Sequence, residues 1–332
     1  MGSPKPGHTP TLGEDETLQS IRGLLGNGIE RFGLRDDAGV LGLPAGGSLV
    51  VSVDSVVEGV HFDLAFCSPS DVGWKALMRA LSDLAAMGAA PLGALIALCV
   101  PAPVPVGSAS GSGSGSGSGE GVLTLGVMAG VAEASVASGC PVVGGDVSSA
   151  GELVVAVTVL GTVEDGAAAV SRSGAVPGDA LFVTGPCGGS AAGLRELRAG
   201  LDGADAGFAY RRPVARLDEG AVARRCGVHA MLDVSDGLAL DLHRLADASG
   251  VGFTLDAVPV ASGATLDEAL GGGEDYQLVM AVAEADVEAL EREFDAAGLE
   301  EPVRVGSVVA DPELRLLGTS ELERLGWQHR VG

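Results

Sequence analysis

Residues 82–89, Ser-Asp-Leu-Ala-Ala-Met-Gly-Ala, constrain the fold of this chain more than any other stretch. They close an apolar helical run and place Asp83 where the helix gives way to a glycine-containing turn. Similar surroundings, with small residues at or near the end of a strand-like run, recur around Asp37, Asp54, Asp146, Asp233 and Asp236. Strand ends and tight turns gather functional side chains. We therefore expect these acids to meet around magnesium, and the magnesium to hold phosphates.

The charge balance excludes several classes of partner. The chain has 44 acidic and 20 basic residues, a formal net charge of −24. Such a surface repels nucleic acids and anionic membranes, so we expect neither as a partner. Only two of the basic residues are lysines, Lys5 and Lys75, and no Gly-Lys pair exists. A Walker A phosphate-binding loop is therefore excluded, and ATP would need bridging cations to bind.

The cysteines and the apolar runs favour a cytoplasmic location. The five cysteines lie far apart without a Cys-x-x-Cys motif, as expected of small buried hydrophobes in a reducing compartment. Residues 1–10 contain no apolar signal core. No uninterrupted apolar run reaches the roughly 18 residues of a membrane span.

Apolar periodicity predicts a mixture of helices and strands. Helices are predicted over 11–27, from Ser70 through Leu84, over 122–137, over 190–198, after Gly237 and over 286–297. Strands are predicted over 48–54, 91–100, 142–146, 153–160, 180–184, 230–232 and 278–282. The two types do not alternate strictly, which predicts α+β layers rather than one doubly wound sheet.

The length of 332 residues allows two domains, each with its own core. We place the boundary in the small-residue joint 164–169, which gives an N-terminal domain over 1–164 and a C-terminal domain over 165–332. The Gly-Ser tract 107–121 has almost no apolar residue to bury, so we predict a flexible loop there.

Each of these signals also has an ordinary structural interpretation. Asp37 or Asp54 alone is typical of a solvated turn, and Ser235 or Asp236 could cap the helix that follows. The glycines at 144–145, 188–189 and 271–273 suit plain turns, although they also let backbone N–H groups approach a phosphate.

Three larger side chains leave similar alternatives open. Arg172 could grip a phosphate or lie on the surface, and His61 could be structural. Trp74 belongs to the apolar stripe of its helix, so we expect it in the core. Trp327 lies in a polar tail, where it could cover a core edge or stack on a cationic ring.

Taken together, the motifs resemble the thiamine-monophosphate kinases, in the superfamily of aminoimidazole-ribonucleotide synthetase. The matching blocks keep their order and spacing over nearly the whole chain and lie at 36–38, 53–55, 58–62, 74–77, 81–89, 144–146, 171–175, 190–194, 233–238 and 272–276. The blocks Gly-Gly-Glu-Asp-Tyr at 272–276 and Gly-Val-His-Phe at 59–62 favour this branch over the purine, selenophosphate and hydrogenase-maturation relatives.

The resemblance implies a two-domain PurM-like fold of the α+β class. Its N-terminal domain would bind ATP and magnesium and form a homodimer in which the two N-terminal sheets join in a barrel. Its C-terminal domain would be an α/β sandwich that completes the active site. The implied activity is ATP-dependent phosphorylation of thiamine monophosphate to thiamine diphosphate, with several magnesium ions as cofactors.

The resemblance also implies roles for particular residues. The magnesium ligands would be Asp37, Ser52, Val53, Asp54, Asp83, Asp146, Asp233 and Asp236. The ions on Asp83 and Asp236 would touch the transferring phosphate. ATP would contact Gly145, Arg172 and Ser235, and the thiamine substrate would contact His61, Glu274 and Trp327.

The chain departs from the family pattern at two places. At Val53 the family often has threonine, so a hydroxyl is lost and only a backbone carbonyl can bind metal there. The Gly-Ser tract stands where the family has an acidic, aromatic-containing helical entry.

The implied mechanism needs no covalent enzyme intermediate. The nucleophile would be an oxygen of the substrate's own phosphate, which is already ionised at neutral pH. Two unit charges about 4 Å apart repel by roughly 4 kcal/mol at an effective dielectric near 20, and bridging magnesium reverses that repulsion. Two other functions stay open: another ATP-using enzyme of the same superfamily, and a non-catalytic nucleotide-binding subunit.

Overall fold

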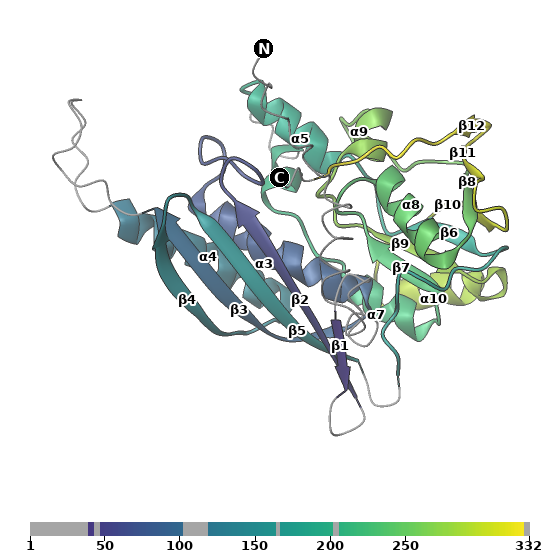
Figure 1. The fold of residues 1–332 in the computed structure, drawn as a ribbon, viewed down its shortest axis with the longest axis horizontal. Coiled ribbons are helices and arrows are strands. Elements are labelled where there is room, and N and C mark those ends of the chain that lie inside the picture. Colours follow the sequence, from purple (N-terminus) through teal and green to yellow (C-terminus); the bar gives the residue numbers. More distant parts are fainter. Residues whose placement is uncertain (1–38, 43–46, 102–118, 164–166, 202–205, 329–332) are drawn as a thin grey trace, which may run out of the picture.

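The computed structural model describes residues 39–42, 47–101, 119–163, 167–201 and 206–328. The predicted helix 11–27, Asp37 and most of the Gly-Ser tract lie outside these residues. The described chain forms two sheets, each covered by helices, and so confirms the α+β class (Figure 1).

The N-terminal sheet has five strands in the order β1-β2-β5-β3-β4. They are β1 (Gly39–Gly42), β2 (Ser48–Val57), β5 (Val154–Val163), β3 (Ala90–Pro101) and β4 (Val142–Ala150). All neighbours are antiparallel except β3 and β4. The helices α3 (Pro69–Ala86) and α4 (Gly119–Ser138) lie together behind one face of this sheet (Figure 1).

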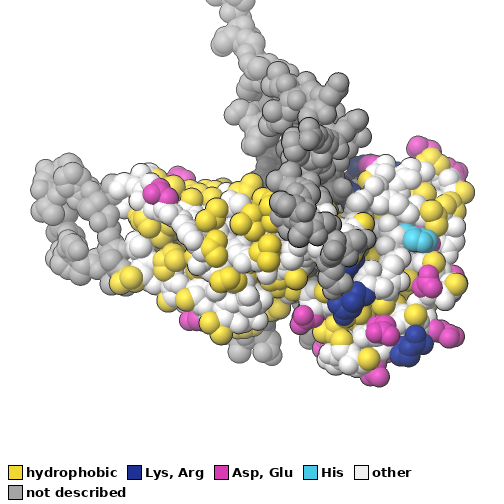
Figure 2. Space-filling model, turned by 90° about the horizontal axis from the view of Figure 1, so that it is seen from below, with side chains coloured by type: hydrophobic (Ala, Val, Ile, Leu, Met, Phe, Trp, Pro, Cys, Tyr) yellow, Lys and Arg dark blue, Asp and Glu magenta, His cyan; other side chains and the backbone are white. Residues whose placement is uncertain are grey.

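Only one face of the N-terminal sheet is buried. Along β5, Val155, Val157 and Val159 point into the core beneath the helices, whereas the residues between them are half-buried. On the opposite face, Val53 of β2 is 66% exposed and Leu95 of β3 is 40% exposed. Hydrophobic side chains are accordingly common on the N-terminal half in Figure 2. Among the described residues this sheet is open, and the barrel expected across a dimer stays a prediction.

Helix α3 begins slightly earlier in the chain than predicted. Ser68, not Ser70, is the N-cap: its hydroxyl accepts from the Asp71 amide while the Asp71 carboxylate accepts from the Ser68 amide. Pro69 occupies the first helical position, where its missing N–H is not needed. The prediction from Ser70 was wrong because this proline fixes the start of the helix.

Glycines let α3 and α4 pack backbone against backbone. A methyl group at Gly130 of α4 would collide with the carbonyl oxygen of Ser70, and one at Gly73 of α3 with that of Val127.

Gly130→Ala is therefore expected to cost about 1–3 kcal/mol of stability by overpacking. Thermal unfolding should show a clear fall in the melting temperature. Gly151→Ala, at an open position, is the control, and equal melting temperatures for the two variants would contradict close packing.

The C-terminal sheet has seven strands in the order β12-β11-β8-β10-β6-β9-β7. They are β12 (Ser320–Glu321), β11 (Arg315–Leu317), β8 (Gly252–Leu255), β10 (Val303–Val309), β6 (Ala180–Val183), β9 (Leu278–Val282) and β7 (Ala230–Asp233). The helices are α5 (Gly189–Arg198), α6 (Ala206–Arg211), α7 (Leu217–Arg225), α8 (Leu238–Ser249), α9 (Leu266–Gly271), the short 3-10 helix η1 (Glu284–Asp286) and α10 (Val287–Ala296).

Helices cover both faces of this second sheet. Leu181 and Val183 of β6 pack in the core that contains α8 and α9, while Phe182 between them packs in the core that contains α7 and α10. Burial on both faces explains why β6 and β9 are continuous apolar runs. Helices on both faces agree with the expected α/β sandwich.

Helix α3 also contacts the C-terminal half. Gly220 of α7 packs against the backbone of Ala85, and Ser82 donates a hydrogen bond of 2.6 Å to Asp233 at the end of β7. The last turns of α3 therefore lie against both halves of the described chain.

Candidate active site

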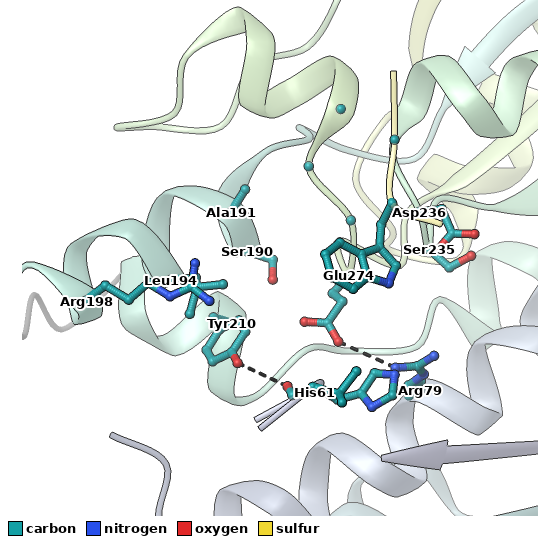
Figure 3. A pocket seen from close by; sticks show the side chains of 16 residues that line it. His61, Arg79, Ser190, Ala191, Leu194, Arg198, Tyr210, Ser235, Asp236 and Glu274 are labelled. Carbon is teal, nitrogen blue, oxygen red and sulfur yellow. Dashed lines mark hydrogen bonds and ion pairs between the residues drawn. The ribbon is translucent and has the colours of Figure 1, made fainter. Parts of the chain in front are cut away.

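A pocket of about 330 Å³ lies between the two halves of the chain (Figure 3). Val60, His61 and Arg79 line it from the N-terminal half. The C-terminal half contributes Ser190, Ala191, Leu194, Arg198, Tyr210, Ser235, Asp236, Gly271, Gly272, Gly273, Glu274, Gly326 and Trp327. Several predicted site residues from distant parts of the sequence thus meet in one cavity: His61, Ser235, Asp236, Glu274 and Trp327.

One group of predicted metal ligands lies between β2 and α3. Alternation along β2 turns Ser52 and Asp54 toward the helix and Val53 away from it. The Ser52 hydroxyl donates to the Asp83 carboxylate, and Arg79, one helical turn before Asp83, donates to Asp54. Since the Val53 side chain points to the opposite face, only its backbone could serve a metal on this side.

The second group lies at the end of β7. Asp233 is 3% exposed and accepts the hydrogen bond from Ser82. Because Ser82 and Asp83 are neighbours on α3, that one turn of helix brings the acids of β2 and β7 toward each other. Asp236 follows in the turn before α8 and is paired with Arg244.

The expected capping of α8 by Ser235 or Asp236 was wrong. The N-cap is Gly237, whose φ is 129°, and no side chain caps at that position. Instead Asp241 accepts hydrogen bonds from the amides of Asp236 and Gly237, at 3.0 and 3.2 Å. Burial, and then the charge of Asp236, raises the pKa of Asp241 to about 7. The side chains of Ser235 and Asp236 do not cap the helix, and both residues line the pocket.

Glu274 lies in a strained loop that several side chains hold. Its φ is 66°, and that of Tyr276 is 51°, both in the left-handed region that non-glycine residues rarely adopt. Lys75 donates to Glu274 at 2.7 Å, and Arg79 lies 3.6 Å from its other oxygen. These contacts from α3 turn the carboxylate of Glu274 toward the pocket (Figure 3).

Asp275 settles the role of the glycines at 188–189. Its carboxylate accepts from the amides of Gly188 and Ser190 at 2.5 and 3.0 Å, and so occupies the N-terminus of α5. The interpretation of this pair as a phosphate-binding turn is therefore wrong, because an internal carboxylate already takes those donors. Burial raises the pKa of Asp275 to about 6.

Lys75 joins His61 to the rest of the site. The lysine is 1% exposed. Its ammonium group donates a hydrogen bond to the His61 carbonyl at 3.0 Å and lies 3.7 Å from the centre of the Tyr210 ring. The Tyr210 hydroxyl donates to the same carbonyl. Nδ1 of the His61 ring accepts from the Val57 amide at 3.1 Å, which places the ring proton on Nε2.

Trp327 reaches the pocket through a tail fastened to α8. Its amide donates to the Asp236 carbonyl at 2.9 Å, and its side chain is 53% exposed. Further back, the Leu240 amide donates to Leu325, and Nε2 of His243 donates to Leu322 at 2.8 Å. Trp74, in contrast, packs partly buried against the N-terminal core, as expected.

Acidification below about pH 6.5 is expected to weaken the fold through His243. Burial, aided by the charge of Arg315 on its Nδ1 side, lowers the pKa of His243. The unfolded chain then binds more protons than the folded one, so stability is full above that pH and falls below it. Urea unfolding at pH 7.5 and 5.5 should show a smaller loss in His243→Gln than in the wild type.

The comparison with the variant is needed because Asp241 and Asp275 titrate in the same range with the opposite sign. Their pKa values are raised to about 7 and about 6, so protonation of these two groups favours the folded state. Arg315, Arg324 and Asp247 also lie around His243. Equal losses in both proteins would mean that another group titrates.

Three predicted residues, Asp146, Gly145 and Arg172, belong neither to this pocket nor to the two groups of acids beside it. Asp146 lies on β4, and two strands, β5 and β3, stand between β4 and β2. At the usual strand spacing, β4 is therefore about 14 Å from β2. Gly145 is explained by packing, since a methyl group there would collide with Ile96. Arg172 follows Ser171, whose carbonyl accepts from Met231 in β7, and it does not line the pocket.

The acidic and hydroxyl groups suit magnesium ions that each take a few protein ligands and complete their coordination with water and phosphate. Among the described residues, no three acidic, histidine or cysteine side chains converge tightly enough to hold a metal ion by themselves. Magnesium usually takes one or two carboxylates together with water and substrate phosphates. The hard oxygens of Ser52, Asp54 and Asp83 on one side, and of Asp233 and Asp236 on the other, fit that pattern.

Sequence reasoning missed several residues that shape the site. Lys75 had one available signal, its rarity in a chain with two lysines. Asp275 lies in the motif block 272–276, although no role was assigned to it. Arg79, Tyr210 and Arg244 had no such signal, because each gains its role from partners that only the fold brings close.

Two domains with a pocket between them, and acids gathered beside it, agree with the family models that match this chain. Residues 35–163 match the family model "AIR synthase related protein, N-terminal domain", and residues 176–318 match "AIR synthase related protein, C-terminal domain". Within that class, the chain belongs to the thiamine-monophosphate kinase family, as the motifs predicted.

The relatives cover most of the chain. The thiamine-monophosphate kinase of Bacillus subtilis (strain 168) is 33% identical over 322 residues, which span 90% of this chain and 93% of that protein. The enzyme of Synechococcus elongatus is 34% identical over 319 residues, 89% and 90% of the two chains. A solved structure of AaThiL complexed with AMPPCP and TMP is similar with a TM-score of 0.80 at 28% identity, covering 96% of this chain and 97% of that one.

Within the residues that the structure describes, no helix combines the length and the apolar character that crossing a membrane requires.

Proposed function

We propose that this chain transfers the γ-phosphate of ATP to the phosphate of thiamine monophosphate, giving thiamine diphosphate, at magnesium ions held by its aspartates. The pocket between the two domains carries this proposal. It joins a side with acidic groups to a side with aromatic and polar groups, as a substrate with a phosphate and a cationic ring requires. The relatives of this chain bear the name of that enzyme, and AaThiL binds AMPPCP and TMP.

The two sides of the pocket would divide the work. Asp236 and Ser235 lie on one side of Glu274, and Arg198 and Leu194 lie on the other (Figure 3). The phosphate would face Asp236 and the acids of β2 and α3. The rings would lie against Trp327, with Glu274 and His61 fixing their polar edges.

The chain's own residues position the reactants and need no strong base. Magnesium held by Asp54, Asp83, Asp233 and Asp236 would neutralise the phosphates and align the in-line transfer. Ser52 and Ser82 donate to Asp83 and Asp233 and so fix the orientation of two predicted ligands. The phosphate nucleophile is already ionised, so no side chain has to remove a proton from it.

The full ligand set includes residues outside this pocket. We propose Asp37, Ser52, the Val53 backbone, Asp54, Asp83, Asp146, Asp233 and Asp236 for magnesium, with Gly145, Arg172 and Ser235 for ATP. We further propose a homodimer that covers the apolar outer face of the N-terminal sheet, because exposed apolar patches of this kind mark association sites. Asp146 lies in register with Ala97 on that outer face, so dimerisation would also enclose it.

We propose a cytoplasmic location as well. All five cysteines are free thiols, and Cys67, Cys140 and Cys187 are buried. Free cysteines suit a reducing compartment.

One assay tests the activity. The protein is incubated with ATP, magnesium and thiamine monophosphate, and the products are separated by chromatography; thiamine diphosphate is expected. ATP consumption without thiamine diphosphate would instead indicate a different enzyme of the same superfamily. Nucleotide binding without any transfer would indicate a non-catalytic subunit.

Replacing Trp327 with alanine is expected to raise the KM for thiamine monophosphate while leaving that for ATP nearly unchanged. A cation–π contact is worth roughly 0.5–2 kcal/mol, which corresponds to about a 2- to 30-fold change. Steady-state kinetics with each substrate varied separately measures both constants. If both rise together, or neither changes, Trp327 only covers the structure and the ring is recognised elsewhere.

A further inference from the structure

Arg79 bridges two carboxylates that the proposed function assigns to different ligands. It donates to Asp54, a predicted magnesium ligand, and lies 3.6 Å from Glu274, a predicted thiamine contact. All three side chains are largely buried, at 16%, 25% and 21% exposure for Arg79, Asp54 and Glu274. The guanidinium therefore supplies the positive charge that lets these two acids lie close together away from water.

The chemistry of this pair opposes a second cation. Burial lowers the pKa of Arg79, but nearby negative charges, including those of Asp54 and Glu274, outweigh it and raise the pKa. An arginine guanidinium keeps its charge at neutral pH. A magnesium ion on Asp54 would lie beside that same guanidinium, and like charges at a largely buried site repel strongly. The other oxygen of Asp54 is also engaged, by the Ser55 amide at 2.8 Å.

We propose that Arg79 is an internal counter-ion: it holds Asp54 and Glu274 in place without metal and must yield Asp54 for magnesium to bind. This inference rests on the proposed function, because that function makes Asp54 a metal ligand. Arg79 is then a positioning residue that sets the magnesium concentration at which the site fills. The same arrangement recurs where Arg244 pairs with Asp236.

Arg79 is suited to this exchange by its surroundings. It lines the pocket, so it can move from Asp54 without leaving the site (Figure 3). Lys75 continues to hold Glu274 at 2.7 Å when Arg79 moves, which keeps the substrate side of the pocket in place. Arg212 provides a matched comparison: it also pairs with two carboxylates, Asp71 and Glu133, but lies outside the pocket.

The test measures binding of magnesium chloride alone by isothermal titration calorimetry, without nucleotide. We expect Arg79→Gln to bind magnesium about five- to tenfold more tightly than the wild type, because the repelling charge is gone. Arg79→Lys keeps the charge and should lie near the wild type, and Arg212→Gln should match the wild type. An unchanged or weaker affinity in Arg79→Gln would overturn the proposal.

Thermal unfolding gives a second, independent readout. In EDTA, Arg79→Gln should melt below the wild type, because Asp54 then loses its counter-ion while Glu274 keeps only Lys75. Magnesium should shrink that difference, whereas the loss in Arg212→Gln should be the same with and without magnesium. A loss in Arg79→Gln that magnesium does not reduce would mean that the arginine is only structural. Formation of thiamine diphosphate by the wild type, measured separately, decides the proposed function, so the two can fail independently.

Discussion

Asp83→Asn and Asp236→Asn are each expected to reduce turnover by about 10²- to 10⁴-fold while the protein stays folded. Each substitution changes almost no volume, so the fold should be kept. It removes a negative charge that the proposed magnesium requires, and removing an electrostatic group at the reacting centre has effects of this size. In Asp83→Asn, the amide oxygen of the new side chain can still accept the hydrogen bond from Ser52. The measurement is kcat for thiamine diphosphate formation at saturating ATP and magnesium, with the melting temperature recorded beside it.

Asp256→Asn is the matched control, since this acid is exposed, in the same chain half as Asp236, and outside the pocket. It should leave kcat near that of the wild type. Near-normal turnover in Asp83→Asn at saturating magnesium would show that this carboxylate does not hold a metal at the transferring phosphate.

Lys75→Met is expected to destabilise the protein by about 3 kcal/mol, as breaking one half of a buried ion pair does. Methionine can fill much of the space of the lysine stem, but the ammonium group holds Glu274 and the His61 carbonyl and contacts the Tyr210 ring. Glu274 would keep only Arg79, at 3.6 Å. Denaturant unfolding measures the loss, and we also expect a higher KM for thiamine monophosphate.

Arg195→Met provides the comparison for an exposed pair. Arg195 binds Glu268 on the surface, where water screens the charges. This variant should unfold almost like the wild type. If Lys75→Met were equally mild, the buried pair between α3 and the Glu274 loop would not hold the two halves of the site together.

Strong local patterns were sufficient for much of the fold. The strand β9 was predicted over the residues it occupies, 278–282. A short apolar run between a glycine-rich and an acidic segment is typical of a buried strand. The helix α10 was predicted to within one residue at each end. The short elements α6, α7, α9, β8, β10, β11 and β12 were not predicted, since their sequences lack a clear period and long-range packing stabilises them.

The sequence by itself determined the family, the acidic character of the site and five of the residues that line its pocket: His61, Ser235, Asp236, Glu274 and Trp327. These properties depend on residue type and spacing, which survive in the chain without folding. Only the tertiary structure decided which charges pair. Lys75 meets Glu274 across 199 positions, Ser82 meets Asp233 across 151, and Asp275 takes the amides at the N-terminus of α5 across 85 or more. Such contacts depend on where distant segments pack, because a hydrogen bond needs its two atoms within about 3 Å and local sequence does not specify that distance.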